Sequence, residues 1–359
     1  MQKKFSYRKK TYIKVVILLS FIILFCVIYE VALRIKGIQP FQPKIHNIIY
    51  EPEFIFAPSS TLGYTLKPGK FKFTMCDLDS LTFNPVHNND SLRITRALQS
   101  EKKYISKEKV YIYGASFTYG FGIEDSLTYP YLLQKAYPHL NFVNFSVPGY
   151  GTIHALLLLK RAVMYNEIPS VVVINYSFYH DDTNTLPRKT RETILRFSNM
   201  LNENFIKKSS FPYADIDHGG KLMIDYIPCG SFYTEWLLRR YSAFINFLEM
   251  KYNETEGKFY DNHMVSKKII NEIHKLCLKN NITLVVAGIN NADLTREMLA
   301  YCDTLGILNS DISVDLSAES KFRLHPKDGH PNAPAHAEFA NKYIKFFREN
   351  SLLNDDENE

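Results

Sequence analysis

Val110-Tyr-Ile-Tyr113, followed at once by Gly114-Ala-Ser116-Phe-Thr-Tyr-Gly120, decides the fold and points to a chemistry. The apolar run predicts a buried strand, and the glycine-flanked segment after it predicts a turn into a helix. Ser116 therefore lies where a strand ends, a position from which a serine can act as a nucleophile. The base that such a serine needs is available far downstream, in Asp328-Gly-His330-Pro-Asn332, just before a helical pattern that starts near Ala333.

The spacing around Ser116 narrows the class of enzyme. An α/β-hydrolase elbow has a glycine two residues after the serine, and Thr118 at that position disfavours the family. The pattern instead resembles the SGNH/GDSL hydrolases, whose first block is Gly-Asp-Ser followed by a glycine, and whose last block pairs Asp with His. Ala115 replaces the usual aspartate, which is not the base of the reaction. The resemblance implies that Ser116 is the nucleophile, His330 its base and Asp328 the residue that orients the base.

Two further stretches carry the resemblance, which runs from about residue 106 to 349. Asn144-Phe-Ser-Val-Pro-Gly149-Tyr-Gly151 is similar to the second block, which implies that the N–H groups of Gly149 and Ser116 hold an oxyanion. The third block normally supplies an asparagine side chain for the same purpose. This chain has His180 at the matching position and Asn184 four residues later, and either is a candidate for the third donor.

Each motif also has a plainer interpretation. A glycine-flanked turn between strand and helix can serve tight packing or bind a phosphate on helix N–H groups. Gly149 can be a turn residue and His180 a surface histidine. His325, His330 and His336 lie near Asp328, but their spacing matches no standard zinc pattern, so we expect no metal. Because Ser116, Asp328 and His330 occur together, we favour catalysis, which requires no cofactor.

Composition sets the outer bounds. The chain has 359 residues, of which 46% are hydrophobic and 22% charged, so it can bury a full core and is not disordered. Its net charge is +6, but many of the basic residues lie close to the N-terminus: Lys3, Lys4, Arg8, Lys9, Lys10 and Lys14. Basic residues in this place indicate the topology of a membrane segment, so we expect no nucleic-acid partner. Among the five cysteines, Cys76, Cys229 and Cys302 are compatible with one disulfide in an oxidising compartment.

An apolar run from Tyr12 to Leu33 directly follows the first basic residues and reaches the roughly 20 residues that span a bilayer. A cleaved signal peptide would need small residues at the end of this run, and the residues from Tyr29 to Arg34 offer a poor site. We therefore predict an uncleaved single-pass anchor in the cytoplasmic membrane. The C-terminal domain is then extracytoplasmic, either periplasmic or at the cell surface.

The sequence predicts a basic tail (1–11), the anchor (12–33), a proline-rich stalk with a small β accessory region (34–105), an SGNH hydrolase-like domain (106–350) and an acidic tail (351–359). Two segments of the stalk region resemble the lead-in of membrane-anchored bacterial members of the family: Leu62-Gly-Tyr-Thr-Leu-Lys-Pro68 and Asn88-Asn-Asp-Ser-Leu-Arg93. An insertion at about 181–262 should determine substrate choice. Its aromatic stripe from Tyr233 to Leu248 has helical spacing and favours core packing, with sugar stacking or membrane contact as alternatives.

From residue 110 onward, apolar strand patterns alternate with helical patterns. Such alternation predicts a parallel sheet covered on both faces. With the resemblance, the fold class is α/β, a flavodoxin-like three-layer sandwich (the SGNH hydrolase fold) preceded by one transmembrane helix. The candidate site residues all follow strand ends, so we expect them at the carboxyl edge of the sheet.

The residues and the resemblance together predict a serine esterase that acts on an acyl or acetyl ester outside the cytoplasmic membrane. Its partner is an ester-bearing small molecule or glycan. If a sugar hydroxyl attacks the acyl-enzyme instead of water, the same site is an O-acyltransferase of envelope polysaccharide. The altered first and third blocks leave a further alternative, an inactive binding protein of the same fold.

Overall fold

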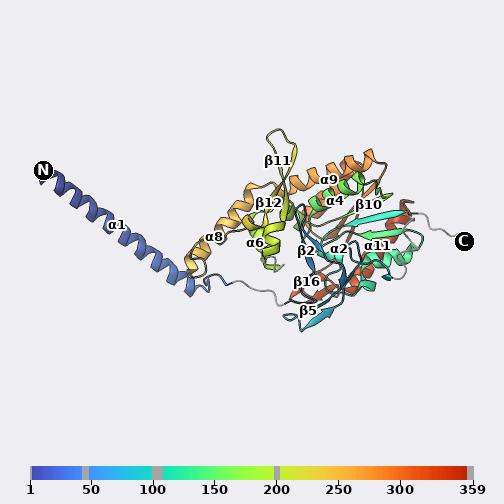
Figure 1. The fold of residues 1–359 in the computed structure, drawn as a ribbon, viewed down its shortest axis with the longest axis horizontal. Helices are drawn as coiled ribbons and strands as arrows, with labels where there is room; N and C mark the ends of the chain where they lie inside the picture. The colour runs from blue at the N-terminus through green and yellow to red at the C-terminus, as the bar shows by residue number, and fades with distance from the viewer. Residues whose placement is uncertain (1, 43–47, 99–107, 198–202, 354–359) are drawn as a thin grey trace. The chain divides into compact units, whose positions relative to one another are not determined.

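The computed structural model describes residues 2–42, 48–98, 108–197 and 203–353 (Figure 1). The chain divides into two compact units. The smaller contains the N-terminal segment up to residue 44 together with residues 233–259, and the larger contains residues 45–232 and 260–359. The larger unit carries the sheet and the candidate site, whereas the smaller carries the apolar N-terminal helix and part of the predicted insertion.

Five parallel strands form the central sheet, in the order β14-β13-β10-β8-β9. They are β8 (Lys109–Tyr113), β9 (Asn141–Asn144), β10 (Val171–Tyr176), β13 (Thr283–Asn290) and β14 (Leu308–Val314). Every neighbouring pair is parallel. If these five strands are numbered along the chain and read from the β9 edge, their order is 2-1-3-4-5. This is the order of flavodoxin-like doubly wound sheets, whose switch point lies between strands 1 and 3, here β8 and β10. The predicted sheet is confirmed.

Helices cover both faces of this sheet (Figure 1). Alternate residues of β8 face opposite sides, so Ile112 joins one apolar cluster and Tyr113 the other. The cluster around Ile112 includes residues of α3 (Tyr129–Ala136) and α11 (Ala333–Glu349). The cluster around Tyr113 includes residues of α4 (Thr152–Met164), α9 (Asn262–Lys279) and α10 (Asp293–Thr304). The three layers match the predicted fold class.

Residues 48–98 belong to the larger unit and do not form a separate stalk. They contain short antiparallel strands: β1 (Ile48–Glu51), β2 (Phe56–Ser59), β3 (Gly63–Leu66), β4 (Gly69–Lys70), β5 (Lys72–Met75), β6 (Leu81–Phe83) and β7 (Val86–His87). Their apolar side chains share a third cluster with Tyr119 and Tyr150, which follow β8 and β9. The expected β accessory region therefore packs directly on the loops that carry the candidate site.

The predicted insertion is divided between the two units. Its part in the larger unit contains α5 (Tyr179–Thr185), α6 (Arg188–Phe197), α7 (Glu203–Lys208), the hairpin of β11 (Ser210–Ile216) and β12 (Leu222–Pro228), and a short 3-10 turn (Cys229–Ser231). The expected helical stripe from Tyr233 is not helical at its start, because Ser242 caps α8 (Ala243–Glu256) and turns precede it. The five cysteines, all among the described residues, are free thiols.

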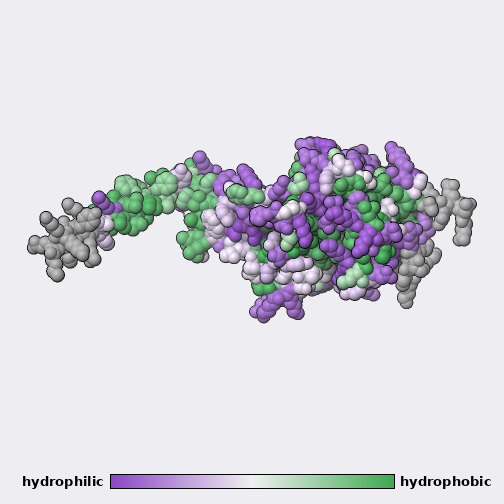
Figure 2. All heavy atoms as spheres, turned by 90° about the horizontal axis from the view of Figure 1, so that it is seen from above, coloured by the Kyte–Doolittle hydropathy of each residue, from purple (hydrophilic) through white to green (hydrophobic). Residues whose placement is uncertain are grey.

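The smaller unit begins with α1 (Gln2–Ile35), whose segment Thr11–Ile35 is long and apolar enough to cross a membrane. Figure 2 shows the apolar outer surface of this helix. A signal sequence passes the same test of length and composition. The last turns of α1 pack against α8 within the unit, with the ring centroids of Tyr29 and Phe244 5.7 Å apart.

Candidate active site

Ser116 is the first residue of α2 (Ser116–Tyr119), which follows β8 after a two-residue turn. The turn is tight because a Cβ on Gly114 would lie 2.2 Å from Oγ1 of Thr118. At the other end, Gly120 closes α2 in a left-handed conformation, with φ of 86°, that favours glycine. The glycines that mark this motif in the sequence therefore hold Ser116 at the carboxyl edge of the sheet.

The structure brings Ser116, His330 and Asp328 together in one row of hydrogen bonds. Nε2 of His330 lies 3.0 Å from Oγ of Ser116, and Nδ1 of His330 lies 2.6 Å from Oδ1 of Asp328. His330 and Asp328 belong to β16 (Asp328–Pro331), which pairs with β15 (Arg323–His325). A proton on Nδ1 satisfies the carboxylate and leaves Nε2 free to accept the serine proton, as a general base must.

Asp328 is held in its charged form. Burial alone would raise the pKa of its carboxyl group, but hydrogen bonds from the side chain and the backbone N–H of His330 outweigh burial and lower the pKa below its usual value. The group is therefore ionised at neutral pH and can stabilise an imidazolium. Two aromatic rings flank His330, with centroids 5.5 Å away for Phe117 and 4.9 Å away for Phe121.

The two backbone N–H groups that the sequence marks as oxyanion donors have no protein acceptor among the described residues. In the described part of the chain, neither Ser116 nor Gly149 donates its N–H to a protein acceptor. Gly149 has φ of 84°, and a Cβ there would lie 2.3 Å from Oη of Tyr64. The same hydroxyl donates a 2.7 Å hydrogen bond to the carbonyl of Pro148. Tyr64, from β3 of the accessory region, thus fixes the loop that carries Gly149.

The two candidates for the third donor differ in their surroundings. His180 is buried at the start of α5, burial lowers its pKa to about 4, and its Nδ1 has no partner among the described residues. Its imidazole is therefore neutral at pH 7. Asn184 donates to the hydroxyls of Thr152 at 2.7 Å and Ser266 at 2.8 Å, and accepts from the N–H of Ile153 at 2.9 Å. Its amide therefore links α5 to α4 and α9, and both of its N–H bonds are already donated within the protein. Asn184 is thus not available as an oxyanion donor.

The remaining histidines near Asp328 have other partners. Nε2 of His325 lies 3.1 Å from Asp79, and Nδ1 of His336 accepts the N–H of Tyr129 at 3.2 Å. The ring of His336 also stacks on that of Tyr129, with centroids 5.7 Å apart. Among the described residues, Nε2 of His336 is buried and has no hydrogen-bond partner.

One residue that shapes the site, Arg93, was not among the predicted site residues. Its buried guanidinium donates to the carbonyls of Tyr119 at 2.7 Å and Ile123 at 2.6 Å, and also to that of Gly120, while Nε pairs with Asp125 at 2.8 Å. These contacts fix the loop after α2, which presents Phe121 to His330. The only sequence signal was the lead-in segment that ends at this arginine, which carried no assigned chemistry.

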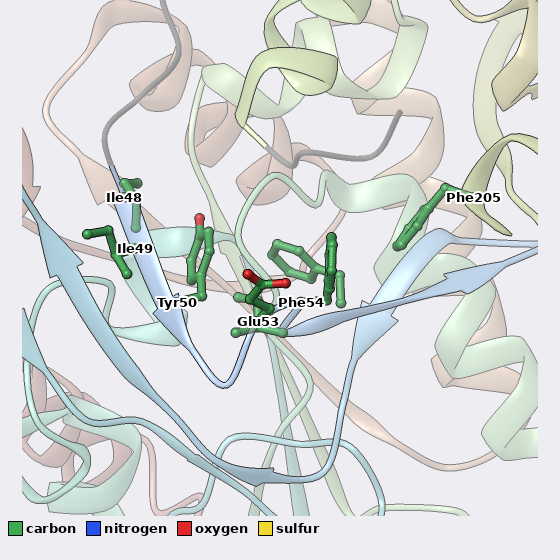
Figure 3. A pocket seen from close by; sticks show the side chains of 8 residues that line it. Ile48, Ile49, Tyr50, Glu53, Phe54 and Phe205 are labelled. Atoms are coloured by element: carbon green, nitrogen blue, oxygen red, sulfur yellow. The ribbon is translucent and has the colours of Figure 1, made fainter. Parts of the chain in front are cut away.

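A cavity of about 240 Å³ lies elsewhere in the larger unit, beside β1 and β2. Figure 3 shows that its wall is mostly apolar and includes Tyr50, Phe54 and Phe205, with the carboxylate of Glu53 among them. None of Ser116, Asp328 and His330 lines this cavity. The side chains of His330 and Asp328 are 24% and 19% exposed, so the row of hydrogen bonds is reached directly from solvent.

No family model matches the sequence, and no curated protein matches it. Solved structures do resemble it. One is the psychrotrophic esterase EstA from Pseudoalteromonas sp., at 12% identity and a TM-score of 0.39, over 68% of this chain and 98% of that one. A second is a lipolytic protein of the G-D-S-L family from Veillonella parvula, at 10% identity and a TM-score of 0.37, over 67% and 98%. A third is Axe2, an acetylxylan esterase from Geobacillus stearothermophilus, at 12% identity and a TM-score of 0.34, over 67% and 93%.

The structural neighbours of this chain are SGNH/GDSL lipolytic esterases. At these identities and TM-scores the likeness does not extend to substrate or activity. The strand order of the sheet defines the fold, and the hydrogen bonds between Ser116, His330 and Asp328 define the candidate site.

Proposed function

We propose that this chain is a serine esterase of the SGNH/GDSL type that acts on an acyl or acetyl ester. The observation that supports this most directly is the row from Ser116 through His330 to Asp328, with hydrogen-bond distances of 3.0 and 2.6 Å. Its order and its distances are those that a nucleophile, a general base and an orienting carboxylate require. It also lies next to the switch point of the sheet, where doubly wound folds bind ligands.

In the first half of the reaction, Oγ of Ser116 attacks the carbonyl carbon of the ester while Nε2 of His330 takes the serine proton. The tetrahedral oxyanion is held by the N–H groups of Ser116 and Gly149. When this intermediate collapses, the bond to the alcohol oxygen breaks, His330 returns the proton to that oxygen, and an acyl-serine remains. Water then attacks the acyl-serine while His330 takes its proton. The bond between the acyl carbon and Oγ of Ser116 breaks, His330 returns the proton to Oγ, and the carboxylic acid is released. No cofactor takes part in these steps.

We assign the third oxyanion donor to His180. Its neutral imidazole can donate an N–H without adding a charge, which is what the asparagine of related sites supplies. One oxyanion donor typically contributes a factor of about 10² to 10³ in rate. A histidine in this place therefore tunes the rate and does not decide whether the reaction occurs.

Transfer to a sugar hydroxyl is the second candidate function. The partial exposure of His330 and Asp328 favours it, because a large acceptor such as a glycan can approach the acyl-serine from solvent. The inactive alternative has less support, since all three residues of the row keep the geometry that catalysis needs.

We further propose that α1 is an uncleaved anchor that places the larger unit outside the cytoplasmic membrane. Glu30, near the end of α1, accepts hydrogen bonds from the hydroxyl of Ser242 at 2.8 Å and from the N–H groups of Ala243 at 3.0 Å and Phe244 at 2.9 Å. It thereby caps the N-terminus of α8. Cleavage after α1 would leave these N–H groups without that acceptor, which supports retention of the helix.

The test is turnover of a short-chain chromogenic ester by the full chain in detergent, with and without a sugar acceptor. We expect hydrolysis, and acylated sugar if transfer is the function. Ser116→Ala should lower kcat/KM by about 10⁴-fold or more, whereas Ser126→Ala, at an exposed serine of the same segment, should not change it. Undiminished turnover in Ser116→Ala would exclude the proposed nucleophile.

A further inference from the structure

The turns before α8 expose three large apolar side chains in the smaller unit. Leu237 is 86% exposed, Leu238 55% and Tyr241 78%. We call these three residues the apolar loop. Leu238 has φ of 69°, a left-handed conformation that costs a non-glycine residue energy. The loop keeps this shape because the carbonyl of Leu238 accepts the N–H groups of Tyr241 and Ser242, both at 2.9 Å.

The apolar loop is attached to the last turns of α1. Nη2 of Arg34 donates to the carbonyl of Tyr241 at 3.3 Å. The neighbouring Ser242 donates its hydroxyl to Glu30, and Glu30 also pairs with Arg34 at 2.6 Å. The apolar loop is therefore held at the level of Glu30 and Arg34, because both members of this ion pair hydrogen-bond to it or to its neighbour Ser242.

That level is where α1 passes from the hydrocarbon core to the headgroups. The residues from Tyr12 to Tyr29 are almost all apolar, whereas Glu30 and Arg34 are the charged groups at the outer end. Charged side chains near the ends of a span lie at the interface, and tyrosine is enriched there. Tyr241 and Ser242, which are hydrogen-bonded to Arg34 and Glu30, therefore lie at the level of this interface.

Beneath the loop, Arg239 points inward. It is buried, lies 3.9 Å from the ring centroid of Phe41 and pairs with Glu249 at 3.2 Å. Arg239 is thus used inside the unit, whereas Arg240 is exposed and pairs with Glu235 at 2.7 Å. The outer side of the segment therefore combines apolar side chains with one basic residue, a composition typical of segments that rest on a membrane.

We propose that Leu237, Leu238 and Tyr241 enter the outer interface of the bilayer that α1 spans. The smaller unit is then held to the membrane at two points, the helix and the apolar loop, and α8 starts at the membrane surface. The proposal depends on the anchor and not on esterase activity. It gives the exposed apolar side chains a lipid partner and the insertion a role other than substrate choice.

The chain carries its own probe, because Trp236 is the only tryptophan and adjoins Leu237. The full chain is placed in nanodiscs of phosphatidylcholine and phosphatidylglycerol, with or without bromine on the upper acyl carbons. We expect brominated lipid to quench the fluorescence of Trp236 and iodide in the water to quench it weakly. Trp236→Phe combined with Leu237→Trp, which places the probe in the loop, should be quenched by brominated lipid more strongly still.

Two further variants make the result decisive. Trp236→Phe combined with Leu24→Trp places the probe inside α1 and should be quenched by brominated lipid whatever the loop does. Leu237→Asp with Leu238→Asp should make Trp236 accessible to iodide without loss of helix by circular dichroism, since both side chains are exposed in the folded unit. The proposal fails if the probe at position 237 responds to iodide alone while the probe at position 24 responds to lipid. If position 24 also fails to respond, the anchor and the proposal fall together, with the esterase site untouched.

Discussion

Asp328 and Ser116 both act through the same imidazole, so their substitutions test one unit. Asp328→Asn keeps the shape but offers Nδ1 of His330 a group that can donate, which favours the tautomer with its proton on Nε2. That tautomer cannot accept the serine proton. We expect kcat to fall by about 10³- to 10⁴-fold with little change in KM. The double variant with Ser116→Ala should be no slower than Ser116→Ala alone, because the residues act as a unit. Additive losses in the double variant would mean that the residues do not act together.

His180 is tested by replacing it with the residue that the family pattern expects. His180→Asn should retain or raise kcat because the amide supplies an N–H donor, whereas His180→Ala should lower kcat by about 10²-fold. Steady-state kinetics on the same chromogenic ester measures both. A loss in His180→Asn as large as that in His180→Ala would show that the imidazole has a function that an amide cannot replace.

At the scale of elements, the accessory β region holds the loops of the site through Arg93 and Tyr64. Arg93→Lys keeps the charge but cannot reach the carbonyls of Tyr119, Gly120 and Ile123 together. Buried groups left unpaired cost about 1 to 3 kcal/mol each, so we expect a clear fall in the unfolding temperature. Because the loop carries Phe121 against His330, kcat should fall more than KM rises. Arg296→Lys is the matched control, because Arg296 forms an exposed ion pair with Asp293. It should change neither the unfolding temperature nor kcat. Equal stability of the Arg93 variant and the native chain would rule out this clamp.

The same elements show what sequence can and cannot predict. The parallel strands could be predicted because each is a local apolar run, and Ser116, Asp328 and His330 could be singled out as candidates because each lies in a short motif. The packing of residues 48–98 was missed because it depends on contacts with partners far along the chain, such as that of Tyr64 with Pro148. The start of the 233–248 stripe was misread as helix because side-chain spacing does not reveal the turns that Ser242 ends.

For the whole molecule, buried histidines predict how stability depends on pH. Burial lowers the pKa of His87 and His180 to about 4 and that of His154 and His336 to about 3. In the unfolded chain the same groups titrate near 6.5. Below that pH these histidines bind protons in the unfolded chain but stay neutral in the folded one. The free energy of unfolding therefore falls as the pH drops from about 6.5 towards 4. Above 6.5 this contribution is constant.

Urea unfolding of the full chain in detergent, followed by circular dichroism between pH 4.5 and 7.5, measures this slope. Each histidine contributes up to about 1.4 kcal/mol per pH unit within the window. Burial raises the pKa of Asp125 and Asp182, which acts in the opposite direction and reduces the net slope. His180→Asn removes one of the four groups and should flatten the slope by up to about that amount, whereas His218→Asn, at an exposed position, should leave it unchanged. A slope that is flat down to pH 4.5 in the native chain would mean that these histidines bind protons as readily in the folded state as in the unfolded one.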